Sequence, residues 1–208
     1  MVGNSVKRVD AKEKVLGRAK FVEDIVPANS LVAYVKHSTI ANGRVLSIDT
    51  REAESLPGVV KVVTCFDVPD IQFATPGHPW SMDPEHRDVP DRKMLNVRVR
   101  HYGDCIAAVV ADNEVTAQRA LKLLKVEYEE YPVLLTPQEA LAPGASVLHE
   151  ERPDNIVKET TYEEGDWDKA VSHEGLVCVK DTYTTLPVQH CHIENPGSFA
   201  YMEGERIV

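Results

Sequence analysis

The sequence predicts an α+β fold, built from short, mostly antiparallel strands with two or three short packed helices. Two observations lead to this prediction. Short runs rich in valine and isoleucine, separated by turn residues, recur between residues 31 and 131 and are typical of strands. Residues 105–131 combine an apolar strand, a helix with one apolar face and a second strand, and this is the clearest pattern in the chain.

Residues 31–38 and 45–49 are the first two predicted strands, because both are short and rich in strand-forming residues. The sequence Ala-Asn-Gly-Arg lies between them. An Asn-Gly pair favours the tight turn of a hairpin, since both residues tolerate positive φ angles. We therefore expect these two strands to pair with each other.

A short helix is predicted for residues 50–56 and a buried strand for residues 59–66. Asp49 and Glu52 have the spacing of a capping box, in which two side chains bond to free N–H groups of the first helical turn. The Pro-Gly pair after this segment would end the helix.

Residues 69–92 form a long stretch without a helix or strand pattern, because five prolines interrupt it. A segment of this length without secondary structure is often functional. Two interpretations stay open. The segment is either an interface loop that presents His78, Trp80 and His86, or a solvated connection.

The central pattern consists of strands at 105–111 and 125–131 around a helix at about 114–125, and a half-exposed strand at 97–100 precedes it. Asp112 or Asn113 can accept hydrogen bonds from the first free N–H groups of the helix. Its apolar residues follow the spacing of one helical face: Ala117, Ala120, Leu121 and Leu124.

A second capping box, Thr-x-x-Glu with proline at the first helical position, predicts a short helix at residues 136–142. Residues 143–165 are acidic and lack apolar periodicity, so they are predicted to link two domains. A short helix near residues 166–173 and a strand at residues 176–185 follow.

Composition and charge exclude several classes of protein. The formal net charge is −10, and the basic residues are scattered, so nucleic acid is not an expected partner. The four cysteines form no Cys-x-x-Cys pair, which favours a reducing compartment. No secretory signal precedes the first strand, and no apolar run approaches the length of about 20 residues that spans a bilayer. We expect a cytoplasmic protein without a membrane partner.

The segment Gln-His-Cys-His-Ile-Glu near the end of the chain is the one candidate for metal binding. If it is extended, His190, His192 and Glu194 share one face, and two imidazoles with a carboxylate could hold zinc or iron. The remaining histidines stand singly, so no fourth ligand is evident. These residues are therefore either a metal site or hydrogen-bonded structural residues.

No catalytic signature emerges from the residues themselves. A phosphate-binding glycine-rich loop and a Gly-x-Ser-x-Gly elbow are both missing from the sequence. Ser38 follows His37 directly, but adjacency in sequence does not make a catalytic triad. The chain ends in the apolar residues Ile207 and Val208 on an unfinished predicted strand, an edge that proteins usually protect, so we expect a truncated chain.

Three segments in this order carry a resemblance to a known family: KRVDAKEKVLGRAKFVEDI, HYGDCIAAVVADNEVTAQRALKLLKVEYEEYPVLLTPQEAL and PVQHCHIENPGSFAYME. They resemble the molybdenum-binding subunits of the xanthine dehydrogenase and aldehyde oxidase family, the molybdenum hydroxylases. The resemblance covers nearly the whole chain. It implies an α/β-hammerhead domain at residues 1–142, a linker at 143–165 and the incomplete start of a molybdenum-binding domain at 166–208.

The resemblance also implies what this chain lacks. The family's glycine-rich pterin-binding segments, the glutamine near molybdenum and the glutamate that acts as general base would all follow residue 208. No residue of this sequence matches a catalytic, cofactor-binding or metal-binding position of the family. We therefore expect a scaffold and subunit-contact domain that binds no cofactor and is inactive alone.

Full-length members of the family hydroxylate purines or other N-heterocycles with oxygen from water, which places them in purine metabolism. Molybdenum-pterin, 2Fe-2S clusters and FAD carry the electrons, so the implied partners are the remainder of the molybdenum subunit and the FAD-binding and iron-sulfur subunits or domains. Two alternatives remain: a non-enzymatic binding module, and a small metalloprotein that uses His190, His192 and Glu194.

Overall fold

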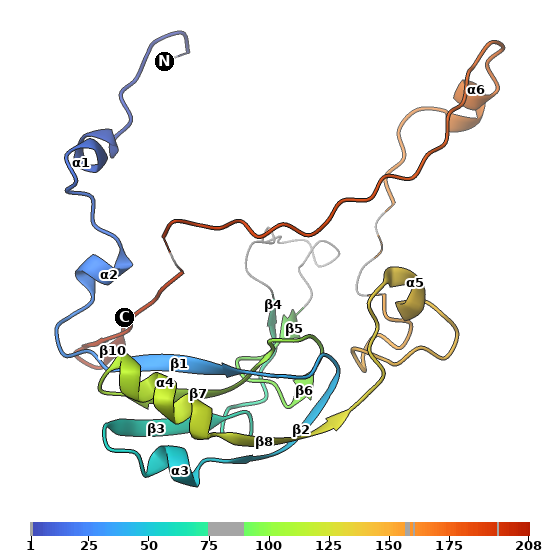
Figure 1. Ribbon diagram of the computed structural model, residues 1–208. Helices are drawn as coiled ribbons and strands as arrows, with labels where there is room; N and C mark the ends of the chain where they lie inside the picture. The colour runs from blue at the N-terminus through green and yellow to red at the C-terminus, as the bar shows by residue number, and fades with distance from the viewer. Residues whose placement is uncertain (1, 75–89, 157–158, 160, 195) are drawn as a thin grey trace. The chain divides into compact units, whose positions relative to one another are not determined.

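The computed structural model describes residues 2–74, 90–156, 159, 161–194 and 196–208 (Figure 1). The chain divides into two units. One is the compact unit Leu31–Glu163, and the other combines Met1–Ser30 with Glu164–Val208.

The compact unit contains two three-stranded antiparallel sheets and a small two-stranded sheet (Figure 1). The first sheet has the order β1 (Val32–His37), β7 (Cys105–Ala111) and β3 (Val59–Thr64). The second has the order β6 (Arg98–Val99), β2 (Gly43–Asp49) and β8 (Lys125–Glu130). The small sheet pairs β4 (Phe73–Ala74) with β5 (Pro90–Arg92). The helices are α3 (Arg51–Glu54), α4 (Glu114–Leu123) and α5 (Pro137–Ala140). This arrangement confirms the expected α+β class.

Helix α4 packs against the first sheet through small side chains. Ala117 and Ala120 are completely buried, and their face of the helix meets Ala107 and Val109 of β7. Because alanine projects little beyond its Cβ atom, the helix can approach the strand closely. The apolar face predicted for this helix is confirmed.

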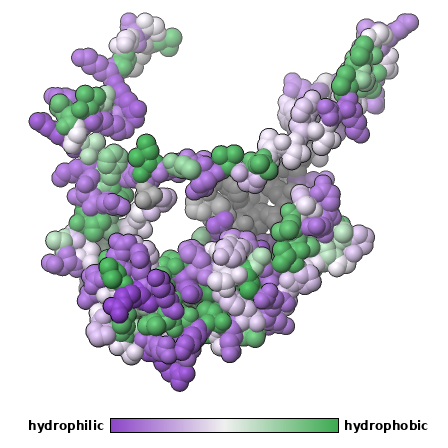
Figure 2. Space-filling view, in the orientation of Figure 1, coloured by the Kyte–Doolittle hydropathy of each residue, from purple (hydrophilic) through white to green (hydrophobic). Residues whose placement is uncertain are grey.

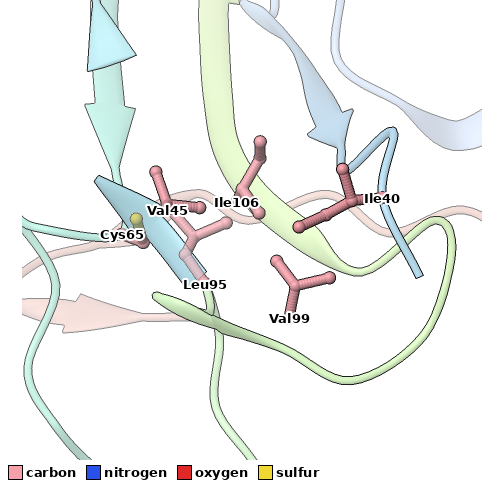
Figure 3. Packing of buried hydrophobic residues seen from close by; sticks show 6 residues of the cluster. All are labelled: Ile40, Val45, Cys65, Leu95, Val99 and Ile106. Carbon is pink, nitrogen blue, oxygen red and sulfur yellow. The ribbon is translucent and has the colours of Figure 1, made fainter. Parts of the chain in front are cut away.

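A second core lies where β2, β6 and β7 come together. It consists of six buried residues from strands and loops across the unit (Figure 3). They are Ile40, Val45, Cys65, Leu95, Val99 and Ile106. Successive side chains of a strand point to opposite faces of the sheet. The fully buried Ile106 therefore lies in this second core and its neighbour Ala107 in the core next to α4, so β7 contributes to both cores.

The hairpin expected from residues 31–49 is wrong. Strand β1 pairs with β7, whereas β2 pairs with β6 and β8. The Asn-Gly pair instead contacts β8 and the residues that follow it. Asn42 is buried and donates to the carbonyl oxygen of Pro132 at 2.5 Å, and Gly43 lies so close to β8 that a Cβ atom would be 2.2 Å from the carbonyl oxygen of Glu129.

Two of the three predicted helix caps form in the structure. Thr136 and Glu139 form the predicted capping box: the hydroxyl oxygen of Thr136 accepts from the N–H of Glu139 at 3.2 Å, and the carboxylate accepts from the N–H of Thr136 at 3.0 Å. Asn113 caps α4 by accepting from the N–H of Thr116 at 2.9 Å. The box expected from Asp49 and Glu52 is wrong, because Thr50 occupies the N-cap position and the Asp49 carboxylate bonds to Arg51.

The other unit has short elements only. They are α1 (Ala11–Val15), α2 (Val22–Ile25), α6 (Trp167–Val171), β9 (Met202–Glu203) and β10 (Arg206–Ile207). Strands β9 and β10 pair as an antiparallel hairpin at the end of the chain. The strand expected at 176–185 is wrong, since the described chain offers it no partner strand and its residues are exposed. Figure 2 shows hydrophobic side chains on the surface around α6, where Trp167 is 77% exposed.

Candidate functional site

The two histidines of the candidate metal site lie side by side. The rings of His190 and His192 stack with centroids 5.4 Å apart and planes inclined by only 7°. Between them Cys191 has a φ of 50°, in the left-handed region, so the extended alternation is interrupted. Parallel rings do not direct their in-plane nitrogens to one point, as ligands about 2.0–2.1 Å from zinc must.

Glu194 makes a separate contact. Its carboxylate oxygen Oε1 accepts from the N–H of Val22 at 3.4 Å, within the same unit. Over the described residues, no group of three or more His, Cys, Asp or Glu side chains is arranged to hold a metal ion. The structure therefore brings together His190 and His192 but does not complete a ligand set with Glu194.

The loop hypothesis cannot be placed on the structure in the same way. His78, Trp80 and His86 fall in 75–89, outside the described residues. On either side of this range, β4 and β5 pair as an antiparallel ribbon. Its second strand leads into the part of the chain that lines the site described next.

The described part of the compact unit contains a basic groove that sequence reasoning missed. Two cavities of about 170 and 610 Å³ lie between residues 92–101 and the segment 146–150, and Lys93 lines both. We call them together the Lys93 groove. The lining contributes five cationic side chains, Arg44, Arg92, Lys93, Arg98 and Arg100, against the two carboxylates of Asp104 and Glu150.

The floor of the smaller cavity is a buried hydrogen-bonded network around Asp104. Its carboxylate oxygen Oδ1 accepts from the side-chain amide of Asn96 at 2.8 Å, and Oδ2 accepts from the N–H of Arg100 at 3.2 Å. The N–H of Asp104 donates to the hydroxyl oxygen of Ser38 at 3.1 Å. Because Asp104 is only 7% exposed, these bonds hold the loop before β7 in one conformation. Gly103, with a φ of 90°, supplies the bend into this loop.

Arg98 lies in the wall of the larger cavity. Its guanidinium donates to the carbonyl oxygens of Gly43 at 2.8 Å and Val147 at 3.2 Å, and lies 5.0 Å from the ring centroid of Tyr131. Burial lowers the pKa of Arg98, and the neighbouring charge of Arg100 adds to this effect. Arginine keeps its proton at any physiological pH, so a cation stays fixed here.

Arg100 has a matching role in the smaller cavity. Its Nε atom donates to the carbonyl oxygen of Leu148 at 2.5 Å. Together with the bond from Arg98 to Val147, this contact fastens the segment after α5 to the second sheet. Asn155 holds this segment together internally, because its side chain donates to the carbonyl oxygens of Ala140 and Ser146.

The adjacent pair His37 and Ser38 is structural. A ring nitrogen of His37, Nδ1, lies 2.8 Å from the carbonyl oxygen of Gly103, and the N–H of Ser38 donates to the carbonyl oxygen of Asp104 at 2.8 Å. The hydroxyl of Ser38 is buried and donates to backbone carbonyl oxygens. His37 and Ser38 therefore stabilise the loop before β7.

The described structure contains four free cysteines. Burial raises the pKa of the Cys65 thiol to about 11, and burial together with the charge of Asp104 raises the pKa of Cys105. Both thiols therefore stay protonated near neutral pH and are poor nucleophiles. Cys178 and Cys191 are exposed.

Only part of the Lys93 groove is visible in the sequence. Arg98 and Arg100 alternate with valines in a strand, which places their side chains on one face. Arg44 comes from a different strand, and the segment 146–150 closes the groove from beyond α5. The spacing of the basic residues gives no hint that the fold gathers them.

A family model supports the fold. The model described as "Aldehyde oxidase and xanthine dehydrogenase, a/b hammerhead domain" matches residues 16–132. Among solved structures, the aldehyde oxidoreductase of Desulfovibrio desulfuricans superimposes with a TM-score of 0.62 and 34% sequence identity, covering 73% of this chain and 17% of that chain. The strand and helix order of the compact unit is thus similar to that of a known enzyme structure.

Curated relatives extend the similarity to nearly the full length. The chain is 43% identical over 198 residues to the xanthine dehydrogenase molybdenum-binding subunit of Escherichia coli O157:H7, covering 95% of this chain and 26% of that protein. It is 31% identical over 209 residues to the nicotinate dehydrogenase large molybdopterin subunit of Eubacterium barkeri, covering 100% of this chain and 46% of that protein. The chain thus spans well under two thirds of the length of either relative.

None of the helices in the described residues has the length and hydrophobicity that crossing a bilayer requires.

Proposed function

Because the chain belongs to the aldehyde oxidase and xanthine dehydrogenase family, we propose that it is the N-terminal part of the molybdenum-binding subunit of a xanthine dehydrogenase-like hydroxylase. The observation that carries this proposal is the 43% identity over 198 residues to a xanthine dehydrogenase molybdenum-binding subunit. The complete enzyme would hydroxylate a purine or another N-heterocycle with oxygen from water, in the cytoplasm, as a step of purine metabolism.

In this proposal the chain is a scaffold. Residues 1–142 form the hammerhead domain, 143–165 the linker and 166–208 the start of a molybdenum-binding domain. The compact unit ends at Glu163, close to the proposed start of the molybdenum-binding domain, but it includes most of the proposed linker and leaves out residues 1–30. Large apolar side chains such as Trp167, Tyr183 and Leu186 are exposed in the second unit, which suits a surface that contacts other parts of an enzyme.

In this proposal the molybdenum-pterin group is held outside this chain. The described residues hold no cluster of metal-ligating side chains, and the sequence has no glycine-rich phosphate-binding loop. We therefore derive no chemical step from these residues. The pterin, the 2Fe-2S clusters and FAD would be held by the remainder of the molybdenum subunit and by FAD-binding and iron-sulfur partners, and the isolated chain would be inactive.

The experiment combines elemental analysis of the purified 208-residue chain with an assay of xanthine-dependent dye reduction. We expect neither stoichiometric molybdenum, iron or zinc nor turnover, whereas a complete xanthine dehydrogenase treated in parallel shows both. Stoichiometric metal that disappears in the variant with His190→Ala and His192→Ala would contradict the scaffold proposal. It would make the end of the chain a metal site in its own right.

A further inference from the structure

Among the arginines of the Lys93 groove, Arg44 pairs with the Glu129 carboxylate at 4.0 Å, whereas Arg98 and Arg100 have no such pair in the described part of the chain. Arg98 and Arg100 donate to backbone carbonyl oxygens, and within the described residues neither has a carboxylate at salt-bridge distance. A carbonyl oxygen is a partial charge, so these bonds satisfy the N–H donors without cancelling the cation. Removing such a cation from water costs free energy unless an anion is close.

The nearby acidic residues are already occupied or exposed. Asp104 is tied to Asn96 and to backbone N–H groups in the floor, and Lys93 pairs with the Asp70 carboxylate, which is 80% exposed. An incoming carboxylate would compete with the exposed Asp70 for Lys93, in a groove whose lining has five cationic side chains against two carboxylates although the whole chain carries −10.

The dimensions of the groove indicate the kind of anion. The smaller cavity, about 170 Å³, is below the roughly 300–1,000 Å³ typical of small-molecule and cofactor sites. It has room for one acidic side chain beside Arg100. The larger cavity, about 610 Å³, adds apolar and aromatic surface from Val97, Tyr131 and Val147. Cationic side chains in both cavities and apolar surface in the larger one suit a polypeptide with carboxylates spaced by apolar residues.

We propose that the Lys93 groove docks an acidic, extended segment of a partner protein chain, with one carboxylate of the segment placed between Lys93 and Arg100. The inference rests on the proposed function only in that a multi-subunit enzyme supplies such a partner. A nucleic acid fits less well, because a dense polyanion would meet the repulsion of a chain with net charge −10.

The test uses fluorescence anisotropy of a fluorescein-labelled peptide, Gly-Glu-Val-Glu-Val-Glu-Gly, titrated with the 208-residue chain at 50 mM salt. We expect saturable binding that weakens at least tenfold at 300 mM salt and at least tenfold when the peptide glutamates are replaced by glutamine. Salt weakens binding because the Debye length falls below the size of the groove. Equal binding of the glutamine peptide would overturn the proposal.

Two variants place the binding in the groove. Arg100→Gln should weaken it at least tenfold, but it also removes the bond to Leu148 and lowers the melting temperature. Arg92→Gln removes an exposed lining charge without changing the core, so it should weaken binding at least threefold at an unchanged melting temperature. Lys61→Gln, at an exposed position of β3 outside the groove lining, is the matched control and should change neither quantity. Equal losses from Lys61→Gln and Arg92→Gln would contradict a local site.

Competition with other anions distinguishes a peptide site from a general anion site. Inorganic phosphate at 10 mM should displace little peptide, and a 20-nucleotide DNA should bind more weakly than the peptide. Displacement by phosphate or tighter binding of DNA would show a general anion site and overturn the peptide proposal. A complete failure to bind would overturn this inference alone, since the proposed function is judged separately by metal content and turnover.

Discussion

Replacing Gly43 by alanine gives a direct test of how β2 and β8 fit together. The new Cβ atom would lie 2.2 Å from the carbonyl oxygen of Glu129 and 2.6 Å from the terminal carbon of Ile40. The first neighbour is backbone within a hydrogen-bonded ladder, so β8 would have to retreat by about 1 Å in an interior that is close-packed. Rotation of a side chain cannot relieve this contact.

The expected destabilisation follows from these contacts. Overpacking costs about 1–3 kcal/mol, and weakening two ladder hydrogen bonds adds about 1 kcal/mol for each. We expect the free energy of unfolding to fall by about 3–5 kcal/mol, a large part of the roughly 5–15 kcal/mol of a typical domain.

Urea unfolding at 25 °C, followed by circular dichroism, measures this change. The control is Gly103→Ala. Gly43 and Gly103 both have a positive φ, of 157° and 90°, but a Cβ atom at Gly103 would meet nothing within 4 Å. Only the strain of the backbone conformation remains there, about 1–2 kcal/mol. A Gly43→Ala chain within 1 kcal/mol of the parent would refute the close approach of β2 and β8.

Three further predictions concern the cores, a helix cap and a buried thiol. Ile106→Ala should cost about 2–5 kcal/mol in urea unfolding because the side chain is fully buried, whereas Val60→Ala, at a position 57% exposed, should cost far less; equal losses would contradict the core assignment. Asn113→Ala should cost about 1 kcal/mol by removing the acceptor for the first turn of α4, and Asn113→Asp should restore most of it. Burial raises the pKa of Cys65 from 9.0 to about 11, so the unfolded chain releases this proton first and the free energy of unfolding should fall as pH rises from 9 to 11; a Cys65→Ala chain with the same decline would contradict this assignment.

The elements that the sequence predicted correctly depend on local interactions. Helix α4 follows from the spacing of its alanines and leucines, and the box of Thr136 and Glu139 forms because both partners lie within one turn. The central strand β7 is apolar on both faces, and it does pack on a core on each side.

The errors arose where a distant partner decides the structure. An Asn-Gly pair favours a hairpin locally, but Asn42 and Gly43 make their closest contacts with Pro132 and Glu129, almost 90 residues further along the chain. Residues 176–185 have the composition of a strand, yet a strand also requires a neighbour for its backbone groups. Composition cannot supply that neighbour.

The candidate site also depends on contacts that the order of residues in the sequence does not reveal. His190, His192 and Glu194 were predicted as a candidate site because they are close in the sequence. In the structure the two histidine rings stack, but the Glu194 carboxylate accepts a hydrogen bond from Val22 instead. The Lys93 groove was missed because its cations come from separate segments and the fold alone assembles them. Family membership, in contrast, was predictable from long ordered motifs, and the hammerhead model over residues 16–132 together with the match to a relative over 95% of this chain confirms it.

The most direct test of the proposed scaffold is a chimera. The 198 aligned residues of the Escherichia coli molybdenum-binding subunit would be replaced by those of this chain, and molybdenum content and xanthine-dependent dye reduction would be compared with the parent enzyme. The same chimera with Ile106→Asp, which buries a charge in the core, serves as the negative control. We predict that the chimera retains the molybdenum-to-protein ratio of the parent and measurable turnover, and that the control loses both. A folded chimera without molybdenum and without turnover would contradict the assignment of this chain as the scaffold of a molybdenum hydroxylase.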